Sequence, residues 1–238
     1  MDSTLLSDFP TVRRLLTAAA KTPVTTVLLG ETGVGKEYAA DMIHKSSARA
    51  SRPFVKFNCV GFAENVVDSE LFGHVRGAFT GATENRIGLL EQANFGTLLI
   101  DEIGDMSMLL QAKLLRFLQD GEVRPVGSNQ TRHVDARVLF ATRRNLEEMV
   151  KAGTFRDDLY YRIADLCITI PPLRSRPSEI PALASTFVAQ ANRDYKANVP
   201  EMTSTDVAAM LRMSWPGNVR ELRSYCRRHV LEGQGFAA

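Results

Sequence analysis

The sequence predicts an α/β fold, in which a parallel five-stranded sheet is flanked by helices and followed by a small helical region. Three observations predict it. A glycine-rich loop at residues 30–37 separates an apolar, β-branched run from a helical pattern. A second apolar run, residues 96–100, ends in two adjacent carboxylates. From residue 177 onward, the hydrophobic pattern is helical only.

Composition limits the function classes. The chain has 238 residues, 45% of them hydrophobic, which is enough for a large domain with a core, alone or with a small satellite. Its formal net charge of +2 is too balanced for a protein that coats nucleic acid. Three widely spaced cysteines favour reduced, buried thiols. The absence of a long apolar run or an apolar leader predicts a cytoplasmic protein with no membrane segment.

Residues 1–23 have apolar positions at helical spacing, and residues 24–29 resemble a buried parallel strand. The loop that follows has the Walker A spacing, with glutamate where serine or threonine usually meets magnesium. Its glycines allow backbone N–H groups to approach a polyphosphate, and its lysine adds a positive charge, although such a turn can also be purely structural. The candidate nucleotide-binding residues are Gly30, Glu31, Thr32, Gly33, Val34, Gly35, Lys36 and Glu37.

Asn58 stands near the end of the second predicted strand, residues 54–59. Polar residues at the carboxyl ends of such strands face the ligand crevice, but an asparagine there can equally satisfy a turn. The next segment has two glycines around an isolated aromatic residue, which favours a flexible loop that displays Phe79, unless the ring is tucked into the core. This loop consists of Gly77, Ala78, Phe79, Thr80, Gly81 and Ala82.

Asp101 and Glu102 follow an apolar strand in the Walker B arrangement. The first acid is placed to hold Mg²⁺ and the second to polarise an attacking water, whereas the alternative is a helix N-cap with a solvated neighbour. A helix is predicted over residues 111–118, and a hairpin-like excursion over residues 123–134. Residues 136–141 predict another strand, and Asn145 at its end either senses phosphate or caps the next helix.

Arg156 and Arg162 lie six residues apart in a helical pattern. They pair either with surface acids such as Asp157 and Asp158 or with the γ-phosphate of a neighbouring subunit. The last predicted strand, residues 167–170, ends at two prolines, so we predict an α/β nucleotide-binding subdomain at residues 1–171 and a helical lid at 172–238. Arg220, near the start of the last helix, is either solvated or placed to contact phosphates.

Together these motifs resemble the central AAA+ ATPase domain of bacterial enhancer-binding proteins, the sigma-54-dependent transcriptional activators. The loop at residues 77–82 reads Gly-Ala-Phe-Thr-Gly-Ala, the GAFTGA sequence that is diagnostic of this family within the AAA+ class. Further marks are the loop at 30–37, the acids at 101–102 and Trp-Pro-Gly-Asn-Val-Arg-Glu-Leu at 215–222. Arg143 stands where members often carry Asn or His.

The resemblance implies a role for each matching residue. Glu102 would be the catalytic carboxylate, Asn58 its switch partner, and Asp101 the Mg²⁺ ligand. Arg156 and Arg162 would be arginine fingers, and Arg220 the sensor II arginine. The GAFTGA loop, with Phe79 and Thr80 at its tip, would contact sigma-54, and residues 127–130 would form a second loop that moves with it.

The function implied is an ATPase that remodels the closed complex of sigma-54 RNA polymerase so that the promoter opens. It would act as a ring, either a homo-oligomer, for which the resemblance implies a hexamer, or a hetero-oligomer, and DNA would be bound only through another domain or a partner. The alternative is a nucleotide-gated regulatory module or an inert ring partner that contacts sigma-54 without efficient hydrolysis.

Overall fold

The computed structural model describes residue 6 and residues 8–233, which form two compact units. The α/β unit consists of Leu15–Leu29 and Glu37–Thr169. The lid unit is the described part of Met1–Arg14, Gly30–Lys36 and Ile170–Ala238, so it includes the glycine-rich loop. A single domain boundary after residue 171 stays a prediction.

The predicted five-stranded parallel sheet is confirmed, with the strand order β2-β5-β8-β1-β9. The central strand β8 and its neighbour β5 are buried along almost their whole length, which explains why their sequences are largely apolar runs without alternation. The strands are β1 (Thr26–Leu29), β2 (Phe54–Asn58), β5 (Thr97–Asp101), β8 (Arg137–Thr142) and β9 (Leu166–Thr169).

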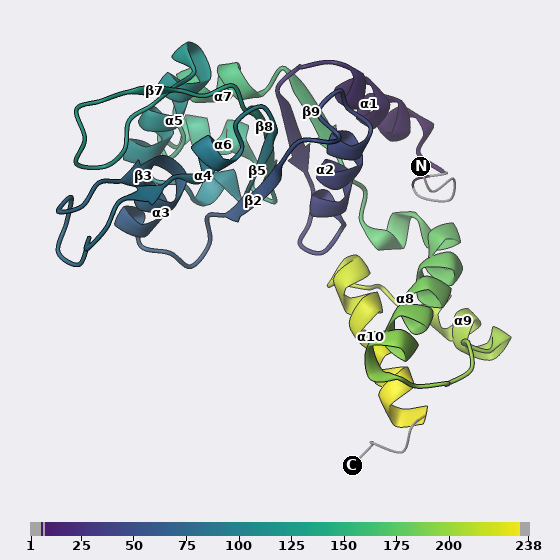
Figure 1. Cartoon of the computed structure of the whole chain (residues 1–238). Coiled ribbons are helices and arrows are strands. Elements are labelled where there is room, and N and C mark those ends of the chain that lie inside the picture. Colours follow the sequence, from purple (N-terminus) through teal and green to yellow (C-terminus); the bar gives the residue numbers. More distant parts are fainter. Residues whose placement is uncertain (1–5, 7, 234–238) are drawn as a thin grey trace. The chain divides into compact units, whose positions relative to one another are not determined.

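Helices pack against this sheet (Figure 1). In the core, Leu98 and Phe140 of the central strands pack with Leu114 and Leu159 from two of the helices. The predicted helix at 111–118 is the inner part of α5, which begins after a Ser107 cap and ends at Gly121. The helices are α1 (Pro10–Lys21), α2 (Lys36–Lys45), α3 (Glu64–Phe72), α4 (Leu89–Gln92), the 3₁₀ helix η1 (Ile103–Asp105), α5 (Met108–Asp120), α6 (Leu146–Lys151) and α7 (Asp157–Ile163).

Two short antiparallel hairpins extend from the α/β unit. Strands β3 (Gly73–His74) and β4 (Arg86–Ile87) enclose the GAFTGA segment. Strands β6 (Glu122–Val123) and β7 (Arg132–His133) enclose the excursion that the sequence predicts. Both loops protrude at the same end of the unit in Figure 1.

The lid unit has a core of its own, which explains why it forms a separate compact body. Leu173, Val188, Met210 and Leu222 surround Trp215, whose indole N–H donates to the Met210 carbonyl at 2.9 Å. Its helices are α8 (Ile180–Tyr195), α9 (Ser204–Leu211), α10 (Asn218–Gly233) and the 3₁₀ turns η2 (Leu173–Ser175) and η3 (Pro177–Glu179).

The three cysteines are free thiols, as predicted. Burial raises the pKa of Cys59 to about 12 and that of Cys226 to about 11, so both remain protonated and unreactive. The expectation of burial is wrong for Cys167, which is exposed because successive side chains of β9 point to opposite faces and its neighbour Ile168 takes the buried one. Among the described residues, no helix is long and apolar enough to span a membrane.

Candidate functional site

Three candidate site residues of the α/β unit, Asn58, Asp101 and Glu102, lie at the carboxyl edge of its sheet. The register pairs Asn58 at the end of β2 with Asp101 at the end of β5. Thr142 ends β8, and its register partner on β1 is Leu29, the residue that precedes the glycine-rich loop. Because parallel strands all end at this edge, residues far apart in sequence lie near one another there, and this is the edge at which open α/β sheets bind ligands.

Glu102 has a strained backbone and a restrained side chain. Its φ of 54° and ψ of 47° are left-handed, which is uncommon for a residue with a side chain. The carboxylate is largely buried and accepts hydrogen bonds from the Arg143 backbone N–H at 3.1 Å and the Thr142 hydroxyl at 3.4 Å. The end of β8 therefore aims the carboxylate that the Walker B pattern assigns to water activation.

The alternative, in which the two acids cap a helix, does not fit this geometry. Glu102 precedes η1, and its side chain makes no capping bond. Asp101 accepts the Glu102 backbone N–H at 3.0 Å and keeps a second carboxylate oxygen. Asn58 donates its side-chain amide to that second oxygen at 3.4 Å, and its own oxygen accepts the Val60 N–H at 2.8 Å. Asn58 thus joins the acidic pair through Asp101 and shapes the turn as well.

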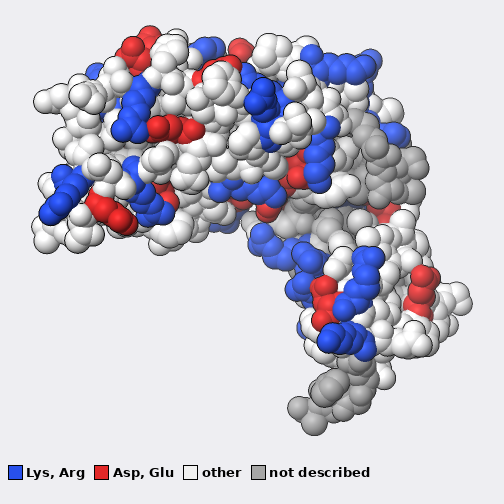
Figure 2. Space-filling view, in the orientation of Figure 1, with Lys and Arg blue, Asp and Glu red and all other residues white. Residues whose placement is uncertain are grey.

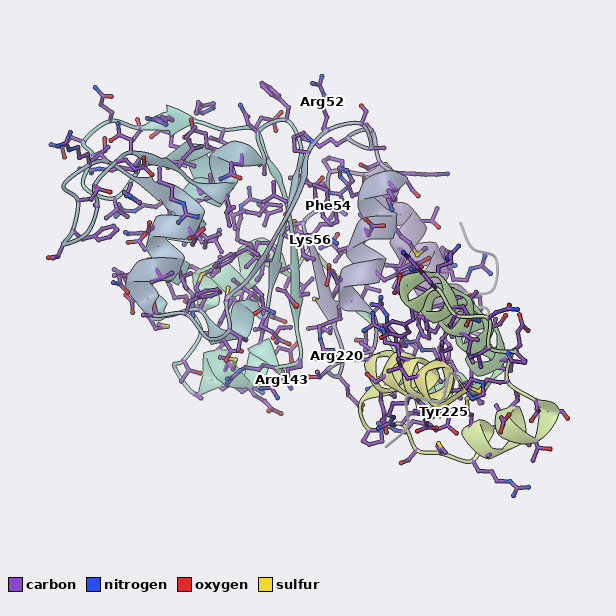
Figure 3. The ribbon with its side chains drawn as sticks, turned by 60° about the horizontal axis from the view of Figure 1, so that its bottom comes forward. Arg52, Phe54, Lys56, Arg143, Arg220 and Tyr225 are labelled. Atoms are coloured by element: carbon purple, nitrogen blue, oxygen red, sulfur yellow. The ribbon has the colours of Figure 1, made fainter. Side chains whose placement is uncertain are left out.

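Arg143 contacts the site through its backbone, whereas Asn145 caps a helix through its side chain. Asn145 accepts the N–H groups of Glu147 and Glu148, so it caps α6, and the capping interpretation is confirmed. The Arg143 side chain, labelled in Figure 3, is exposed, while its backbone N–H donates to Glu102. A different side chain at position 143 therefore leaves that hydrogen bond intact.

The glycine-rich loop has the conformation of a phosphate cradle. Gly30, Gly33 and Gly35 have φ values of 148°, 78° and 104°, which side chains rarely allow. At Gly35, a Cβ would meet nothing within 4 Å, so the loop is open there to an incoming group. The Lys36 ammonium donates to the Gly30 and Glu31 carbonyls at 2.8 and 3.3 Å, and the lysine begins α2.

Each unit has residues whose chemistry suits part of a magnesium nucleotide. Backbone N–H groups and a lysine suit phosphate oxygens, and the Asp101 carboxylate is a hard oxygen ligand of the kind that Mg²⁺ prefers. Mg²⁺ at such sites is held by one or two carboxylates together with the substrate phosphates, so a cage of several protein ligands is not required. Glu37 instead forms an exposed salt bridge with Lys56 at 2.7 Å, and the Lys56 ammonium lies over the Phe54 ring (Figure 3).

Within the lid unit, side chains far along the chain contact the glycine-rich loop. Arg174 and Asn218 both bind the Glu31 carboxylate, and the buried Arg176 donates to the Val34 carbonyl at 2.5 Å. The sequence alone did not predict these contacts, because no local pattern links positions 142 to 187 residues apart. Arg220, labelled in Figure 3, is exposed on α10, and a Cβ at Gly33 would lie 3.0 Å from its Cβ.

The GAFTGA loop is a tight, exposed turn. Gly77 donates to the Ala82 carbonyl at 2.9 Å. Gly77 and Gly81 have φ values of 81° and 98°, and a Cβ at either position would meet nothing within 4 Å. Phe79 as a residue is 41% exposed, and its ring packs edge-on against His74 at 5.0 Å between centroids. It is therefore displayed from the loop and supported from one side, between the two alternatives that the sequence leaves open.

The second hairpin packs against the base of this loop. Val75 donates to the Val126 carbonyl at 3.1 Å, and Val126 donates to the Gly73 carbonyl at 2.9 Å. A Cβ at Gly127 would lie only 2.6 Å from the Ala78 Cβ, so glycine is required there. Displacement of one loop must consequently disturb the other.

The two candidate finger arginines have partners inside the chain. Within the single chain, Arg156 forms a two-bond ion pair with Asp158, at 2.9 and 2.6 Å. Arg162 donates to the Leu118 carbonyl at 2.7 Å. Both are on the surface, and contact with a second subunit stays a prediction.

Gln111 of α5 is a positioning residue that the sequence marked only as part of a helix. It is fully buried, it accepts the Arg156 backbone N–H at 2.8 Å, and its amide donates to the Met106 carbonyl at 2.8 Å. The start of α7, and with it Arg156, is therefore anchored to the helix that follows Asp101 and Glu102.

We expect Gln111→Leu to lower the free energy of unfolding by about 2–4 kcal/mol, because it leaves two or more polar backbone groups unsatisfied in the interior. Urea unfolding measures the effect. Gln92→Leu is the matched control, since Gln92 makes one exposed hydrogen bond to the Ile87 carbonyl. Equal decreases in the free energy of unfolding of the two variants would contradict the anchoring role of Gln111.

Comparison with known proteins identifies both parts of the chain. Residues 6–169 match the Sigma-54 interaction domain family, and residues 174–235 match the AAA+ ATPase lid domain. The nitrogen fixation protein VnfA of Azotobacter vinelandii is 49% identical over 220 residues, covering 92% of this chain and 42% of that protein. The regulatory protein AtoC of Escherichia coli is 43% identical over 234 residues, covering 97% of this chain and 51% of that protein.

Solved structures of similar proteins have the same fold. NtrX of Brucella abortus superimposes with a TM-score of 0.89 at 33% identity, over 99% of this chain and 52% of that one. A second NtrX structure, described as a complex with ATP, has a TM-score of 0.85 at 32% identity, over 96% of this chain and 49% of that one. The chain spans about two fifths to one half of these relatives. The family match, over more than half of the chain, establishes that this protein belongs to the sigma-54 interaction domain family of AAA+ P-loop ATPase domains, which sigma-54-dependent transcriptional regulators share.

Proposed function

We propose that the chain hydrolyses ATP and uses the energy to remodel the closed complex of sigma-54 RNA polymerase, so that the promoter can open. The placement of Glu102 carries the proposal. A carboxylate held by two donors, next to an aspartate at the carboxyl edge of a parallel sheet, is what activation of a water for attack on a phosphate requires. The ATP complex described for NtrX supports nucleotide as the ligand.

Each candidate residue has a proposed task. The loop of residues 30–36 binds the phosphates through N–H groups and Lys36, and Glu102 orients and deprotonates the attacking water. Asp101 would hold Mg²⁺, which neutralises charge on the phosphates when bound. Arg220 adds positive charge from α10, and Arg156 and Arg162 would serve the nucleotide of a neighbouring copy in a ring, which we propose to be hexameric.

The α/β unit also contains a path from the acids to the GAFTGA loop. Lys113 of α5, the helix after Asp101 and Glu102, forms a 2.6 Å salt bridge with Asp68 of α3. Helix α3 leads directly into β3, whose His74 supports the Phe79 ring. A shift of α5 on hydrolysis would therefore reach Phe79, the residue that we propose contacts sigma-54.

The structure gives no specific support to the alternative of an inert regulatory module. Its sequence basis is Arg143, and the contact from position 143 to Glu102 uses the backbone N–H. On the face that Figure 2 shows, basic and acidic side chains are interspersed and form no extended basic patch of the kind that DNA contact requires.

The proposal is tested by measuring ATP hydrolysis per mole of protein at increasing protein concentration. If arginines from a second copy complete the site, the specific activity should rise by at least about tenfold across the assembly range, since an arginine finger in trans contributes about 10³-fold or more. A sedimentation profile over the same range links the rise to assembly. Bound ATP with no hydrolysis at any concentration would favour the inert module.

A further inference from the structure

The glycine-rich loop contains an acidic residue that the lid unit neutralises. Glu31 is the first residue after Gly30 in the candidate phosphate cradle. The Arg174 guanidinium donates two hydrogen bonds to its carboxylate, at 2.8 and 2.5 Å, and the Asn218 amide donates a third at 3.1 Å. The pair is partly exposed, with 49% of the Arg174 side chain and 44% of the Glu31 side chain accessible.

The same side chains also hold the loop backbone. Asn218, which is fully buried, donates to the Thr32 carbonyl at 3.1 Å, and its oxygen accepts the Leu173 N–H at 2.8 Å. Arg176 donates to the Val34 carbonyl at 2.5 Å. The lid thus contacts the loop at three successive points, which explains why these residues form one compact unit.

Glu31 is a charged group in a loop that would bind an anion. The hydrogen bonds from Arg174, followed by that from Asn218, lower the pKa of the Glu31 carboxyl to about 2, so it is ionised at every pH at which ATP hydrolysis is measured. An unpaired carboxylate next to the cradle would repel phosphates. The bidentate guanidinium cancels this charge and fixes the geometry of the carboxylate.

We propose that Glu31, Arg174 and Asn218 form a lid clamp that holds the phosphate-binding loop in its binding conformation, and that Arg174 acts on the nucleotide only through Glu31. This inference rests on the proposed function, because it concerns the nucleotide site. Arg174 is then a positioning residue. Glu31, which the Walker A spacing places among the nucleotide-binding residues, contributes its backbone to the cradle and its side chain to the lid.

The rival role for Arg174 is direct contact with the phosphates. The two roles differ in whether the loss of nucleotide affinity on removal of Arg174 depends on the charge of Glu31. If Arg174 neutralises Glu31, its removal exposes a repulsive charge, and removal of that charge as well should restore binding. If Arg174 binds the phosphates itself, the loss persists whatever stands at position 31. A double-mutant cycle on these two positions separates the roles.

The test measures binding of a fluorescent ATP analogue to wild type, Glu31→Gln, Arg174→Gln and the double variant. We expect Arg174→Gln to weaken binding about tenfold or more, since a misplaced binding group can cost about a hundredfold. Glu31→Gln should weaken binding less than Arg174→Gln does, because glutamine keeps one acceptor for Arg174 and leaves no unpaired negative charge beside the cradle. The double variant should bind at least about threefold more tightly than Arg174→Gln.

A second measurement does not need nucleotide. Hydrogen exchange of the backbone amides at residues 32–36 in the free protein should be faster in Arg174→Gln than in wild type, because the loop loses its clamp. The matched control is Glu91→Gln, which alters a similar two-bond pair with Arg132, at 3.0 and 2.7 Å, in the α/β unit. It should leave both analogue binding and loop exchange unchanged.

Two results would overturn the clamp. In the first, Arg174→Gln binds the analogue like wild type and its loop exchange is unchanged. In the second, the double variant binds the analogue as weakly as Arg174→Gln does. The second result would assign Arg174 to the phosphates. If wild type itself binds no analogue, the proposed nucleotide function fails first. Binding by wild type without the predicted cycle contradicts the clamp alone.

Discussion

Glu102→Gln should reduce ATP hydrolysis by about 10²–10⁴-fold, the range that a positioned general base supplies. Glutamine has the size of glutamate and its oxygen can still accept the Arg143 N–H, so the fold around the sheet edge should persist. What it lacks is the negative charge that takes a proton from water. Phosphate release under saturating ATP measures the loss, and analogue binding should stay within about threefold of wild type.

Asp105→Asn is the control for this variant. Asp105 lies three residues further along, at the end of η1, and pairs with Arg144 on the surface. Its neutralisation removes one carboxylate from the same region without touching Glu102, so hydrolysis should change by no more than about threefold, as expected for a surface ion pair. A Glu102→Gln protein that keeps a tenth or more of the wild-type rate would exclude Glu102 as the base.

The sheet and the two acidic positions were predictable because their signals are local. A buried parallel strand reads as an apolar run, and a glycine-rich loop after it has a fixed spacing. The register that brings Asn58 beside Asp101 follows once the strands are parallel and end at one edge. These features therefore needed no information about distant contacts.

The clamp on the glycine-rich loop was not predictable in this way. Gly33 has a φ of 78°, and a Cβ there would lie 2.3 Å from the Gly217 carbonyl, so the lid also selects glycine at this position. The sequence shows the glycine but not the partner, because the partner comes from a segment more than 180 residues later. The same holds for Glu31, whose neighbours in sequence suggest a nucleotide contact and whose side chain binds Arg174.

The exposure of individual side chains was the second feature that the sequence could not predict. Composition left Phe79 either displayed or buried, and the structure places it in between because His74, itself bound to the Ser69 hydroxyl at 2.7 Å, supports one edge of the ring. That support comes from a packing contact across a turn, which periodicity does not encode. A partly supported aromatic ring loses little conformational freedom on binding, so it is suited to anchor a partner.

Phe79→Ala should reduce sigma-54-dependent promoter opening by about 30-fold or more while ATP hydrolysis stays within about twofold of wild type. The reason is that an aromatic anchor at an interface contributes about 2 kcal/mol or more, and 1.4 kcal/mol corresponds to tenfold. The ring is exposed at the tip of a loop whose turn is closed by backbone hydrogen bonds, so its removal leaves the loop and the Glu102 site intact. Open-complex formation and phosphate release are measured on the same samples.

Phe95→Ala provides the comparison, because Phe95 is an equally large ring on the α/β unit, 57% exposed and outside both loops. It should leave promoter opening and hydrolysis near their wild-type values, which would show that exposed aromatic surface as such is not the cause. Two outcomes would contradict the division between loop and site. If hydrolysis falls together with opening in Phe79→Ala, the ring is part of the fold that supports Glu102, and if opening survives, the contact with sigma-54 lies elsewhere on the chain.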